Sequence, residues 1–275
     1  MRFELHCHST CSDGTESPEQ VAARAADRRV AVFALTDHDT CDGSGVAVPD
    51  PRAIPAIRAI RAIRAVELSC DDGGRTVHVL AFDRGGAWSV LEDRLAAVRE
   101  ARRNRLRVMA ARLARRGIAI DVEPLLAGAE RRSIGRPDLA RAMVAAGAVS
   151  SVADAFARHL YDGGPVDVPH RALALCEALA LGRAAGAAMA LAHPHLYDQR
   201  SAHYLRRHRA DGLTGIEAFY GAYDPRERAR WIALADELGA TCTGGSDWHG
   251  PEAAGPLPGV DLPEDRSAAL LDWLA

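Results

Sequence analysis

The tripeptides His6-Cys7-His8 and Asp247-Trp248-His249 decide the expected fold, because each places two metal-binding side chains two residues apart. On an extended strand, side chains at positions i and i+2 point the same way, so each tripeptide can hold an ion from one strand. Five further potential ligands end or follow apolar, β-like runs between them: Asp13, His38, Glu67, His78 and His193. The pattern predicts a multinuclear metal site built at the ends of several strands.

Seven short apolar runs are predicted to be strands: Phe3–Leu5, Val30–Thr36, Ile60–Leu68, Val77–Phe82, Ala188–Ala192, Gly215–Tyr220 and Ala240–Gly244. Helical patterns lie between most of them. One begins at Ser17 with Pro18 in its first position, and another begins at Asp224 and ends at Gly239. Alternating strands and helices predict an α/β fold with parallel strands and outer helices. Seven such units predict a closed or nearly closed barrel, with its chemistry at the carboxyl ends of the strands.

An all-helical stretch interrupts this alternation. Its predicted helices are Trp88 to Arg116, Val122–Ala129, Arg136 to Ala146 and Ser151 to Leu160. We expect residues 1–87 and 170–275 to form the barrel with the metal site, and residues 88–169 to form a lid that binds substrate at its mouth. The Arg-Ala-Ile repetition between Arg52 and Arg64 is of low complexity and too short for a solenoid.

The bulk composition narrows the class of protein. The chain has 275 residues and a formal net charge of -3, which argues against binding along extended DNA. Its six cysteines include no Cys-x-x-Cys pair, and free thiols fit a reducing cytoplasm. The longest apolar region, Ala172 to Ala192, is interrupted by Glu177 and Arg183, and no apolar leader opens the chain. We expect a cytoplasmic protein without a membrane partner.

The expected ligands divide into three groups that would hold three divalent ions. His6, His8, Glu67 and Asp247 would form the first site, and Asp13, His38 and His249 the second. Glu67 would bridge to a third ion held by His78 and His193. Imidazole and carboxylate without thiolate favour Mn²⁺, Fe²⁺ or Zn²⁺. Each residue alone has an ordinary explanation, such as a turn, a loop cap or a core histidine, but their joint position at strand ends favours a metal site.

These residues resemble the PHP (polymerase and histidinol phosphatase) family of metal-dependent phosphoesterases. The similar segments are His6-Cys7-His8-Ser9, Ser12-Asp13-Gly14, Ala34-Leu35-Thr36-Asp37-His38-Asp39-Thr40, Val66-Glu67-Leu68-Ser69, Ala192-His193-Pro194 and Gly244-Gly245-Ser246-Asp247-Trp248-His249. The resemblance covers nearly the whole chain. It implies a distorted (β/α)₇ barrel with a trinuclear metal site, and we expect Mn²⁺ there before Fe²⁺ or Zn²⁺.

Two features resemble one branch of that family, the nucleoside 3′,5′-bisphosphate phosphatases and the 5′→3′ exoribonucleases of short RNA. One is Asp13, where histidinol-phosphatase-like members typically carry His. The other is the helical insertion with Ser133-Ile134-Gly135-Arg136-Pro137 and Asp162-Gly163-Gly164-Pro165. The resemblance implies a substrate with one phosphate to cleave and a second to hold. The chain departs from the branch at Asp138, usually His, and at His195, usually a small residue.

Three arginines of the insertion are candidates to bind substrate. Arg136 begins a helix, where its guanidinium and nearby backbone N–H groups can bind a phosphate together. Arg102 and Arg105 share one helix face that can point toward the mouth, although an arginine-rich helix is usually a solvated surface. Glu217 either supports a metal-binding histidine from behind or caps a loop.

The expected reaction is hydrolysis of a nucleotide phosphate ester by a metal-bridged hydroxide, with the leaving oxygen protonated by water, Asp13 or His193. An amidohydrolase of the common binuclear type needs a carboxylated Lys, and the chain has no Lys. A mononuclear deaminase would leave several ligands unexplained. A phosphatase of another small metabolite, similar to histidinol phosphate, stays open, as does a non-catalytic PHP module that binds metal or nucleic acid.

Overall fold

The computed structural model describes residues 1–45, 60–170, 172–253 and 255–275, so the Arg-Ala-Ile repetition up to residue 59 lies outside the described residues. The described strands form two sheets, in the orders β10-β1-β2-β3 and β6-β4-β5-β7-β8-β9. The strands are β1 (Arg2–Glu4), β2 (Val32–Phe33), β3 (Arg61–Ala62), β4 (Ala65–Asp71), β5 (Thr76–Phe82), β6 (Leu173–Ala174), β7 (Ala188–Leu191), β8 (Leu213–Tyr220), β9 (Thr241–Gly245) and β10 (Val260–Asp261). The α-helices are α1 (Pro18–Asp27), α2 (Ser89–Ala114), α3 (Glu123–Leu126), α4 (Arg136–Ala145), α5 (Val152–Ala155), α6 (Leu175–Ala184), α7 (Arg200–His208), α8 (Pro225–Leu238) and α9 (Glu264–Trp273). Short helical turns are η1 (Asp42–Gly45), η2 (Phe156–Leu160) and η3 (Pro194–Leu196).

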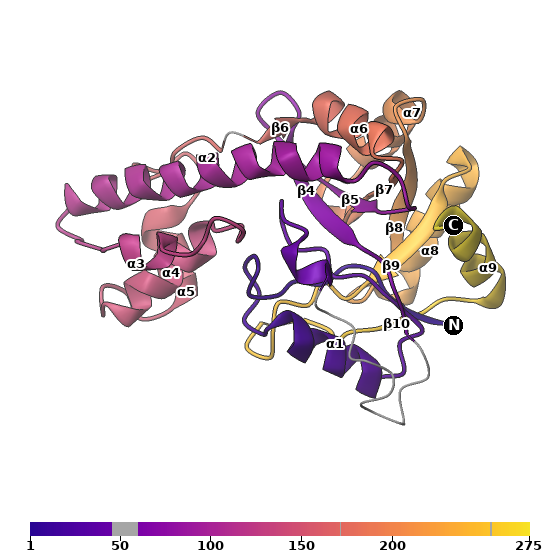
Figure 1. The fold of residues 1–275 in the computed structure, drawn as a ribbon, viewed down its shortest axis with the longest axis horizontal. Coiled ribbons are helices and arrows are strands. Elements are labelled where there is room, and N and C mark those ends of the chain that lie inside the picture. Colours follow the sequence, from indigo (N-terminus) through magenta and orange to yellow (C-terminus); the bar gives the residue numbers. More distant parts are fainter. Residues whose placement is uncertain (46–59, 171, 254) are drawn as a thin grey trace.

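Backbone hydrogen bonds join the two sheets at two places. Leu5 N donates to Gly244 O, which connects the end of β1 to β9. Asp39 N donates to Glu67 O, and His38 pairs with Glu67 in a parallel bridge, which connects the extension of β2 to β4. The strands β1, β2, β4, β5, β7, β8 and β9 therefore follow one another around a common core, and α8 and α9 lie against the sheet on the outside (Figure 1).

The expectation that all seven strands are parallel is wrong for β5. This strand runs antiparallel to both β4 and β7, because the chain reverses in a tight turn at Gly73 and Gly74 instead of crossing over through a helix. Both glycines have positive φ, of 61° and 86°, which favours glycine over other residues. His78 consequently lies near the start of its strand. The reversed direction brings that start to the same rim as the carboxyl ends of the neighbouring strands.

Local sequence signals explain where the helices begin and end. The Ser17 side chain accepts a hydrogen bond from Gln20 N, and the Gln20 side chain accepts one from Ser17 N, with Pro18 at the first helical position of α1. The Asp224 carboxylate accepts bonds from two backbone amides in the first turn of α8. Gly239 ends α8 with a φ of 60°, so both boundaries predicted for α8 are confirmed.

Helix α2 belongs to two hydrophobic cores. In its first half, Leu91, Leu95 and Val98 pack in the main core beneath the sheet. In its second half, Leu106 and Leu113 pack with α3, α4 and the following helices in a second cluster. At about 1.5 Å per residue, a helix of 26 residues is about 39 Å long. Figure 1 shows α2 reaching from the barrel out to the smaller helices at one side.

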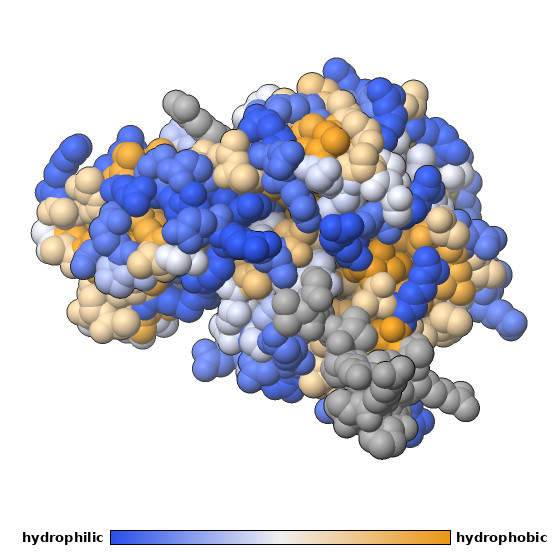
Figure 2. Space-filling view, viewed as in Figure 1, coloured by the Kyte–Doolittle hydropathy of each residue, from blue (hydrophilic) through white to orange (hydrophobic). Residues whose placement is uncertain are grey.

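The insertion lies against the loops that carry the first ligands. Ser133 N donates to Cys11 O at 2.8 Å, and the Thr40 hydroxyl donates to Arg131 O at 2.7 Å. These contacts fix the insertion beside the loops that follow β1 and β2. Figure 2 shows hydrophilic and hydrophobic residues mixed over the surface of the insertion. Within the described part of the chain, no helix combines the length and the apolar character needed to cross a bilayer.

Candidate metal centre

All nine predicted ligands converge at one rim of the sheet. Their donor atoms form four overlapping groups, and within each group the atoms lie within 4.8 Å of one another. The groups are His8, Asp13, His38 and His249; His6, Glu67 and His193; His6, His8 and Asp247; and His38, Glu67 and His78. Glu67 belongs to two groups, as expected. The division differs in detail, because His8 also joins the Asp13 group, His38 also joins Glu67 and His78, and His193 lies with His6. Ligands from both ends of the chain thus meet in one cluster.

The donor atoms at the centre of this cluster fit a cation. His6 Nε2, His38 Nδ1 and Glu67 Oε2 are buried, and none forms a hydrogen bond with any described residue. Glu67 Oε2 lies 3.4 Å from His6 Nε2 and 3.0 Å from His38 Nδ1. A buried polar atom left without a partner costs about 1–3 kcal/mol, and a cation among these atoms would satisfy all three. The donor set is also the imidazole and carboxylate mixture that Mn²⁺, Fe²⁺ and Zn²⁺ accept.

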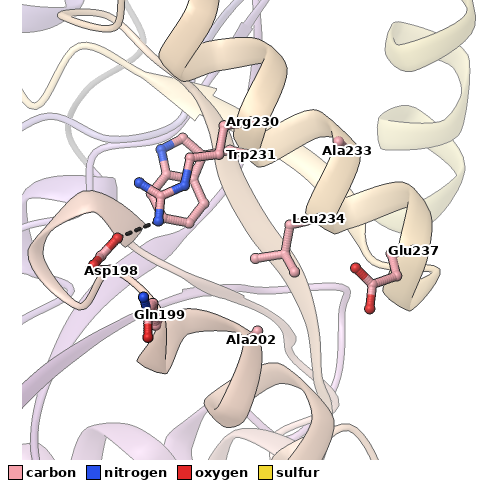
Figure 3. Close-up of a pocket in the computed structure, with 8 residues that line it drawn as sticks. All are labelled: Asp198, Gln199, Ala202, Arg230, Trp231, Ala233, Leu234 and Glu237. Atoms are coloured by element: carbon pink, nitrogen blue, oxygen red, sulfur yellow. Dashed lines mark hydrogen bonds and ion pairs between the residues drawn. The ribbon is translucent and has the colours of Figure 1, made fainter.

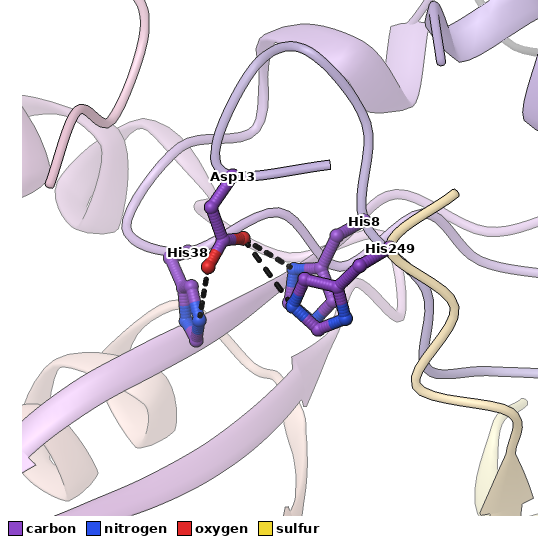
Figure 4. Close-up of side chains that lie close together, drawn as sticks. All are labelled: His8, Asp13, His38 and His249. Atoms are coloured by element: carbon purple, nitrogen blue, oxygen red, sulfur yellow. Dashed lines mark ion pairs between the residues drawn. The ribbon is translucent and has the colours of Figure 1, made fainter. Parts of the chain in front are cut away.

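Asp13 occupies the outer end of the cluster. Its carboxylate lies between His38 on one side and the rings of His8 and His249 on the other (Figure 4). The Asp13 oxygens are 3.7 Å from His38 Nε2, 3.8 Å from His8 Nδ1 and 3.4 Å from His249 Nε2. These distances are too long for strong hydrogen bonds. They leave space for an ion shared by one carboxylate and three imidazoles.

The central residues of the two tripeptides explain why their neighbours face the cluster. Cys7 and Trp248 form a parallel bridge and pack together with Phe33 in a separate apolar cluster. Because side chains alternate along an extended chain, the residues on either side of Cys7 and Trp248 turn to the opposite side. The interpretation of Cys7 as a packed residue is confirmed, since its side chain is fully buried there.

Glu217, within β8, supports two ligands from behind. Its carboxylate lies 2.9 Å from His6 Nδ1 and accepts a hydrogen bond from His193 N at 2.7 Å. The side chain is fully buried. A carboxylate on one ring nitrogen fixes the tautomer and directs the other nitrogen toward an ion. This contact therefore orients His6 Nε2 into the cluster, and of the two interpretations of Glu217 the supporting one is confirmed.

Asp37 and Tyr220 are functional contacts that the sequence patterns did not assign. The Asp37 carboxylate accepts hydrogen bonds from the hydroxyls of Ser9 and Ser12, at 2.7 and 2.6 Å, and so fixes the loop between His8 and Asp13. The Tyr220 hydroxyl donates to Asp247 Oδ2 at 3.1 Å. The serines flanking the histidines were the available signal for Asp37. Tyr220 gave none, because it ends an ordinary apolar strand.

Three non-glycine residues of this rim hold a left-handed backbone. The φ values are 50° for Asp39, 26° for His193 and 56° for Asp247. Such a conformation costs about 1–3 kcal/mol per residue and persists only where surrounding contacts enforce it. Each of these residues either belongs to the cluster or follows one of its histidines. These three backbone conformations therefore lower the stability of the rim, and the surrounding contacts must compensate for them.

Burial and charge pairing shift the ionisation of the cluster strongly. Burial alone would raise the pKa of Glu67 and Asp247, but the surrounding histidines hold both pKa values well below the usual range. Burial lowers the pKa of His8, but the neighbouring carboxylates of Asp247 and Glu67 outweigh it and raise that pKa to about 10. Without an ion, protons therefore balance the carboxylates. A cation that binds here must displace these protons, so its affinity rises with pH.

The three candidate substrate arginines all have partners. Arg102 contacts the buried Asp39 carboxylate, at 2.9 Å from Nε, and donates to the Ser69 hydroxyl at 2.9 Å. Arg105 lies 3.2 Å from an Asp167 oxygen, and Arg136 lies 2.5 Å from an oxygen of the exposed Asp162. Because Asp39 follows His38 directly, Arg102 connects the insertion to a residue beside the cluster.

The two departures from the family branch have different surroundings. Asp138 is buried in the first turn of α4, accepts from Gly135 N at 2.8 Å and pairs with Arg132 and Arg141. Its charge is therefore balanced locally. His195 lies at the opposite part of the rim, with its ring 6.2 Å from that of His193.

A hollow of about 260 Å³ also lies on the outside of the sheet, between α7 and α8 (Figure 3). Its lining includes Asp198, Trp231 and Leu234, and the ion pair between Arg230 and Asp198 spans it. None of the described groups of potential metal ligands includes a residue that lines it. The hollow is therefore separate from the cluster of potential metal ligands.

Comparison with known proteins agrees with this site. The chain is 33% identical over 267 residues to the 3′,5′-nucleoside bisphosphate phosphatase of Chromobacterium violaceum, covering 95% of this chain and 92% of the relative. It is 30% identical to the 5′-3′ exoribonuclease Rnm of Escherichia coli, covering 90% of this chain and 85% of the relative. No known family profile matches the chain.

Solved structures show the same fold. A Bifidobacterium adolescentis protein described as a metal-dependent phosphoesterase superposes with a TM-score of 0.83 at 30% identity, covering 98% of this chain and 96% of that one. A Chromobacterium violaceum protein called an amidohydrolase, with bound sulfate and no metal, superposes with a TM-score of 0.81 at 32% identity, covering 97% and 96%. With the ligand cluster and these relatives together, the chain belongs to the PHP family of metal-dependent phosphoesterases.

Proposed function

We propose that this enzyme hydrolyses a phosphate ester of a nucleotide that carries a second phosphate, either a nucleoside 3′,5′-bisphosphate or the 5′ end of a short RNA. The observation that carries the proposal is the convergence of nine imidazole and carboxylate ligands beside Arg102, which contacts Asp39 next to His38. Relatives over most of the chain are named a nucleoside bisphosphate phosphatase and a 5′-3′ exoribonuclease. The names of these relatives support the substrate class. The ligand cluster would act on one phosphate and the arginines would hold the other, which supports a substrate with two phosphates.

The nine residues of the cluster would hold three divalent cations, with Mn²⁺ ahead of Fe²⁺ and Zn²⁺. Four overlapping groups of donors share His6, His8, His38 and Glu67, so neighbouring ions would share ligands. Bound cations of this kind supply a water of lowered pKa and neutralise charge on phosphate oxygens. The protein's own part is to fix the donors: Glu217 orients His6, Asp37 fixes the loop before Asp13, and Tyr220 holds Asp247.

The leaving oxygen needs a proton when the ester bond breaks. Asp13 and His193 are our candidates to supply it, beside water. Both lie within the cluster: Asp13 among three histidines at its outer end, and His193 with its Nε2 3.0 Å from Glu67 Oε1. Either group would act at hydrogen-bond distance from the ester oxygen, as a general acid requires.

The second phosphate would be held by three arginines of the insertion, called here the arginine cluster: Arg102, Arg105 and Arg136. Burial lowers the pKa of Arg105, and the nearby charges of Arg136 and Arg102 lower it further. His170 lies in the same cluster, where burial and the neighbouring Arg102 lower its pKa to about 3. Its Nε2 is buried and forms no hydrogen bond with any described residue. A group of arginines beside an unpaired donor is well suited to a phosphate.

The decisive experiment follows the products of two substrates. Purified enzyme loaded with Mn²⁺ is given adenosine 3′,5′-bisphosphate and, separately, a 5′-phosphorylated trinucleotide. Release of inorganic phosphate from the first alone supports a phosphatase, and stepwise release of mononucleotides from the second supports an exonuclease. Turnover of neither substrate, by an enzyme that does hydrolyse an unrelated phosphate ester, would overturn the nucleotide assignment while leaving the phosphoesterase intact.

A further inference from the structure

An aromatic wall lines one part of the rim, formed by His195, Tyr220 and Tyr223. The ring centroids of His195 and Tyr220 are 5.2 Å apart, and those of Tyr220 and Tyr223 are 5.0 Å apart. Tyr223 stands behind the other two and is 6% exposed, whereas His195 and Tyr220 are only partly buried. His195 and Tyr220 are therefore partly accessible beside the ligand cluster. His195 lies next to His193, and Tyr220 is hydrogen-bonded to Asp247.

A hydrogen bond from Tyr223 holds the His195 ring in one orientation. The Tyr223 hydroxyl lies 2.8 Å from His195 Nδ1, and it also accepts from His195 N at 3.3 Å. Because the oxygen receives the backbone N–H, its own hydrogen is available for Nδ1. The imidazole is then the tautomer with hydrogen on Nε2, and its plane is fixed by a buried residue. A ring fixed in this way loses little entropy when another ring stacks on it.

In the order of the strands, the aromatic wall lies away from the arginine cluster, on another part of the rim. In the order of strands around the core, His195 and Tyr220 follow β7 and β8, whereas Asp39 and its partner Arg102 are attached to the segment between β2 and β4. Three steps of the strand order separate the two walls. One wall is cationic, the other is aromatic, and the metal ligands lie between them. A nucleotide has the same division, with charged phosphates at one end and an aromatic base at the other.

We propose that His195 and Tyr220 form a platform on which the base of the substrate stacks, and that His195 is a specificity residue for base-bearing phosphate esters. The inference rests on the proposed function, since it names the part of the nucleotide that this wall contacts. Tyr220 is held by its hydrogen bond to Asp247, so the platform is attached to the metal cluster at a fixed distance. A base stacked here would orient its ester bond toward the cluster.

The test compares substrates with and without a base. Values of kcat and KM are measured for wild type, His195→Ala and His195→Phe with adenosine 3′,5′-bisphosphate and with ribose 3,5-bisphosphate, which lacks the base. Stacking of a base on an aromatic side chain contributes about 1–3 kcal/mol, which converts to a change in KM of about 5- to 150-fold. We expect His195→Ala to raise KM in this range for the adenosine compound only, and His195→Phe to restore most of it. His203→Ala, at an exposed histidine of α7, is the matched control and should change neither KM.

Binding measured without turnover separates this proposal from the proposed function. Calorimetry with adenosine monophosphate and with inorganic phosphate should show that His195→Ala weakens the first and leaves the second unchanged, even in an enzyme that hydrolyses neither bisphosphate. Equal losses on both substrates, no loss on either, or a His195→Phe variant as poor as His195→Ala would overturn the platform.

Discussion

The barrel rim and the helical insertion both concentrate charged residues, but they treat them differently. At the rim, buried carboxylates and imidazoles crowd together, and three donor atoms have no hydrogen-bond partner among the described residues. In the insertion, arginines pair with acids nearby, as Arg103 does with Glu100 and Arg107 with Glu123. The rim therefore leaves buried donor atoms without partners, whereas these arginines of the insertion are paired within the protein.

This difference separates two kinds of function. The rim would provide the chemistry, because its donor atoms are already assembled and lack hydrogen-bond partners. A bound cation would satisfy these atoms. Under the proposed function, the paired arginines of the insertion would provide selectivity, because a substrate phosphate must compete with their carboxylate partners. Mutations at the rim should accordingly affect all substrates, and mutations in the insertion should affect some substrates more than others.

The largest effect is expected from Glu67→Ala, because Glu67 belongs to two of the donor groups. Loss of a catalytic cation removes several kcal/mol of transition-state stabilisation, or about 10²- to 10⁴-fold in kcat. Elemental analysis should show less bound metal, and the loss should be equal for a bisphosphate and an aryl phosphate. Alanine at His38 or Asp247 should behave alike. Wild-type activity in any of these variants would refute the ligand assignment.

Asp39→Ala tests the buried ion pair with Arg102 that connects rim and insertion. Its removal leaves Arg102, whose side chain is 12% exposed, without a carboxylate partner. Breaking a buried pair in this way typically costs about 3–5 kcal/mol of folding stability. Urea unfolding should report this cost as a lower midpoint. An unchanged midpoint would show that Arg102 finds another partner and that the two regions are not joined through this pair.

Glu217→Gln sharpens the comparison at the rim, because it removes a charge without removing a ligand. Changing an outer partner of a metal-binding histidine typically weakens metal affinity or activity by about 10- to 100-fold. We expect a loss in this range in a titration with Mn²⁺, with activity recovered at high metal concentration. A loss that excess metal does not restore would point instead to misfolding around His6 and His193.

Arg136→Ala tests selectivity in the insertion. A hydrogen bond to a charged group is worth about 1.5–3 kcal/mol, so KM for a bisphosphate should rise by about 10- to 100-fold. KM for a simple aryl phosphate should hardly change, since it has no second phosphate. Equal changes for both compounds would remove Arg136 from the proposed phosphate site.

The smallest effect is expected at Glu100, an exposed partner of Arg103 on α2. Exposed ion pairs contribute about 0.2–1 kcal/mol, and those within one helix about 0.3–0.5 kcal/mol. Glu100→Gln should therefore shift the unfolding midpoint only slightly and leave both KM values unchanged. It serves as the surface counterpart of Asp39→Ala. A large effect would mean that the charges of the insertion act as a network.

Much of the site was predictable because its signals are local. Strand alternation alone placed His6 and His8 on one side of Cys7, and cap residues placed both ends of α8. The direction of β5 could not be predicted. Two glycines after Asp72 can lead to a hairpin or to a longer loop, and only the pairing with β4 determines which of them forms. The arginine partners were equally hidden. Which carboxylate Arg102 contacts depends on how the insertion packs, which no short pattern encodes.

Helix α2 has one more consequence, for how the mouth can change its width. A single uninterrupted helix is anchored at one end in the main core and at the other in the core of the insertion. Because the helix is unbroken along its 26 residues, it forms a rigid connection and contains no hinge about which the insertion could rotate. The distance between the arginine cluster and the aromatic wall would then be constant. Substrates would be selected by the distance between their phosphate and their base.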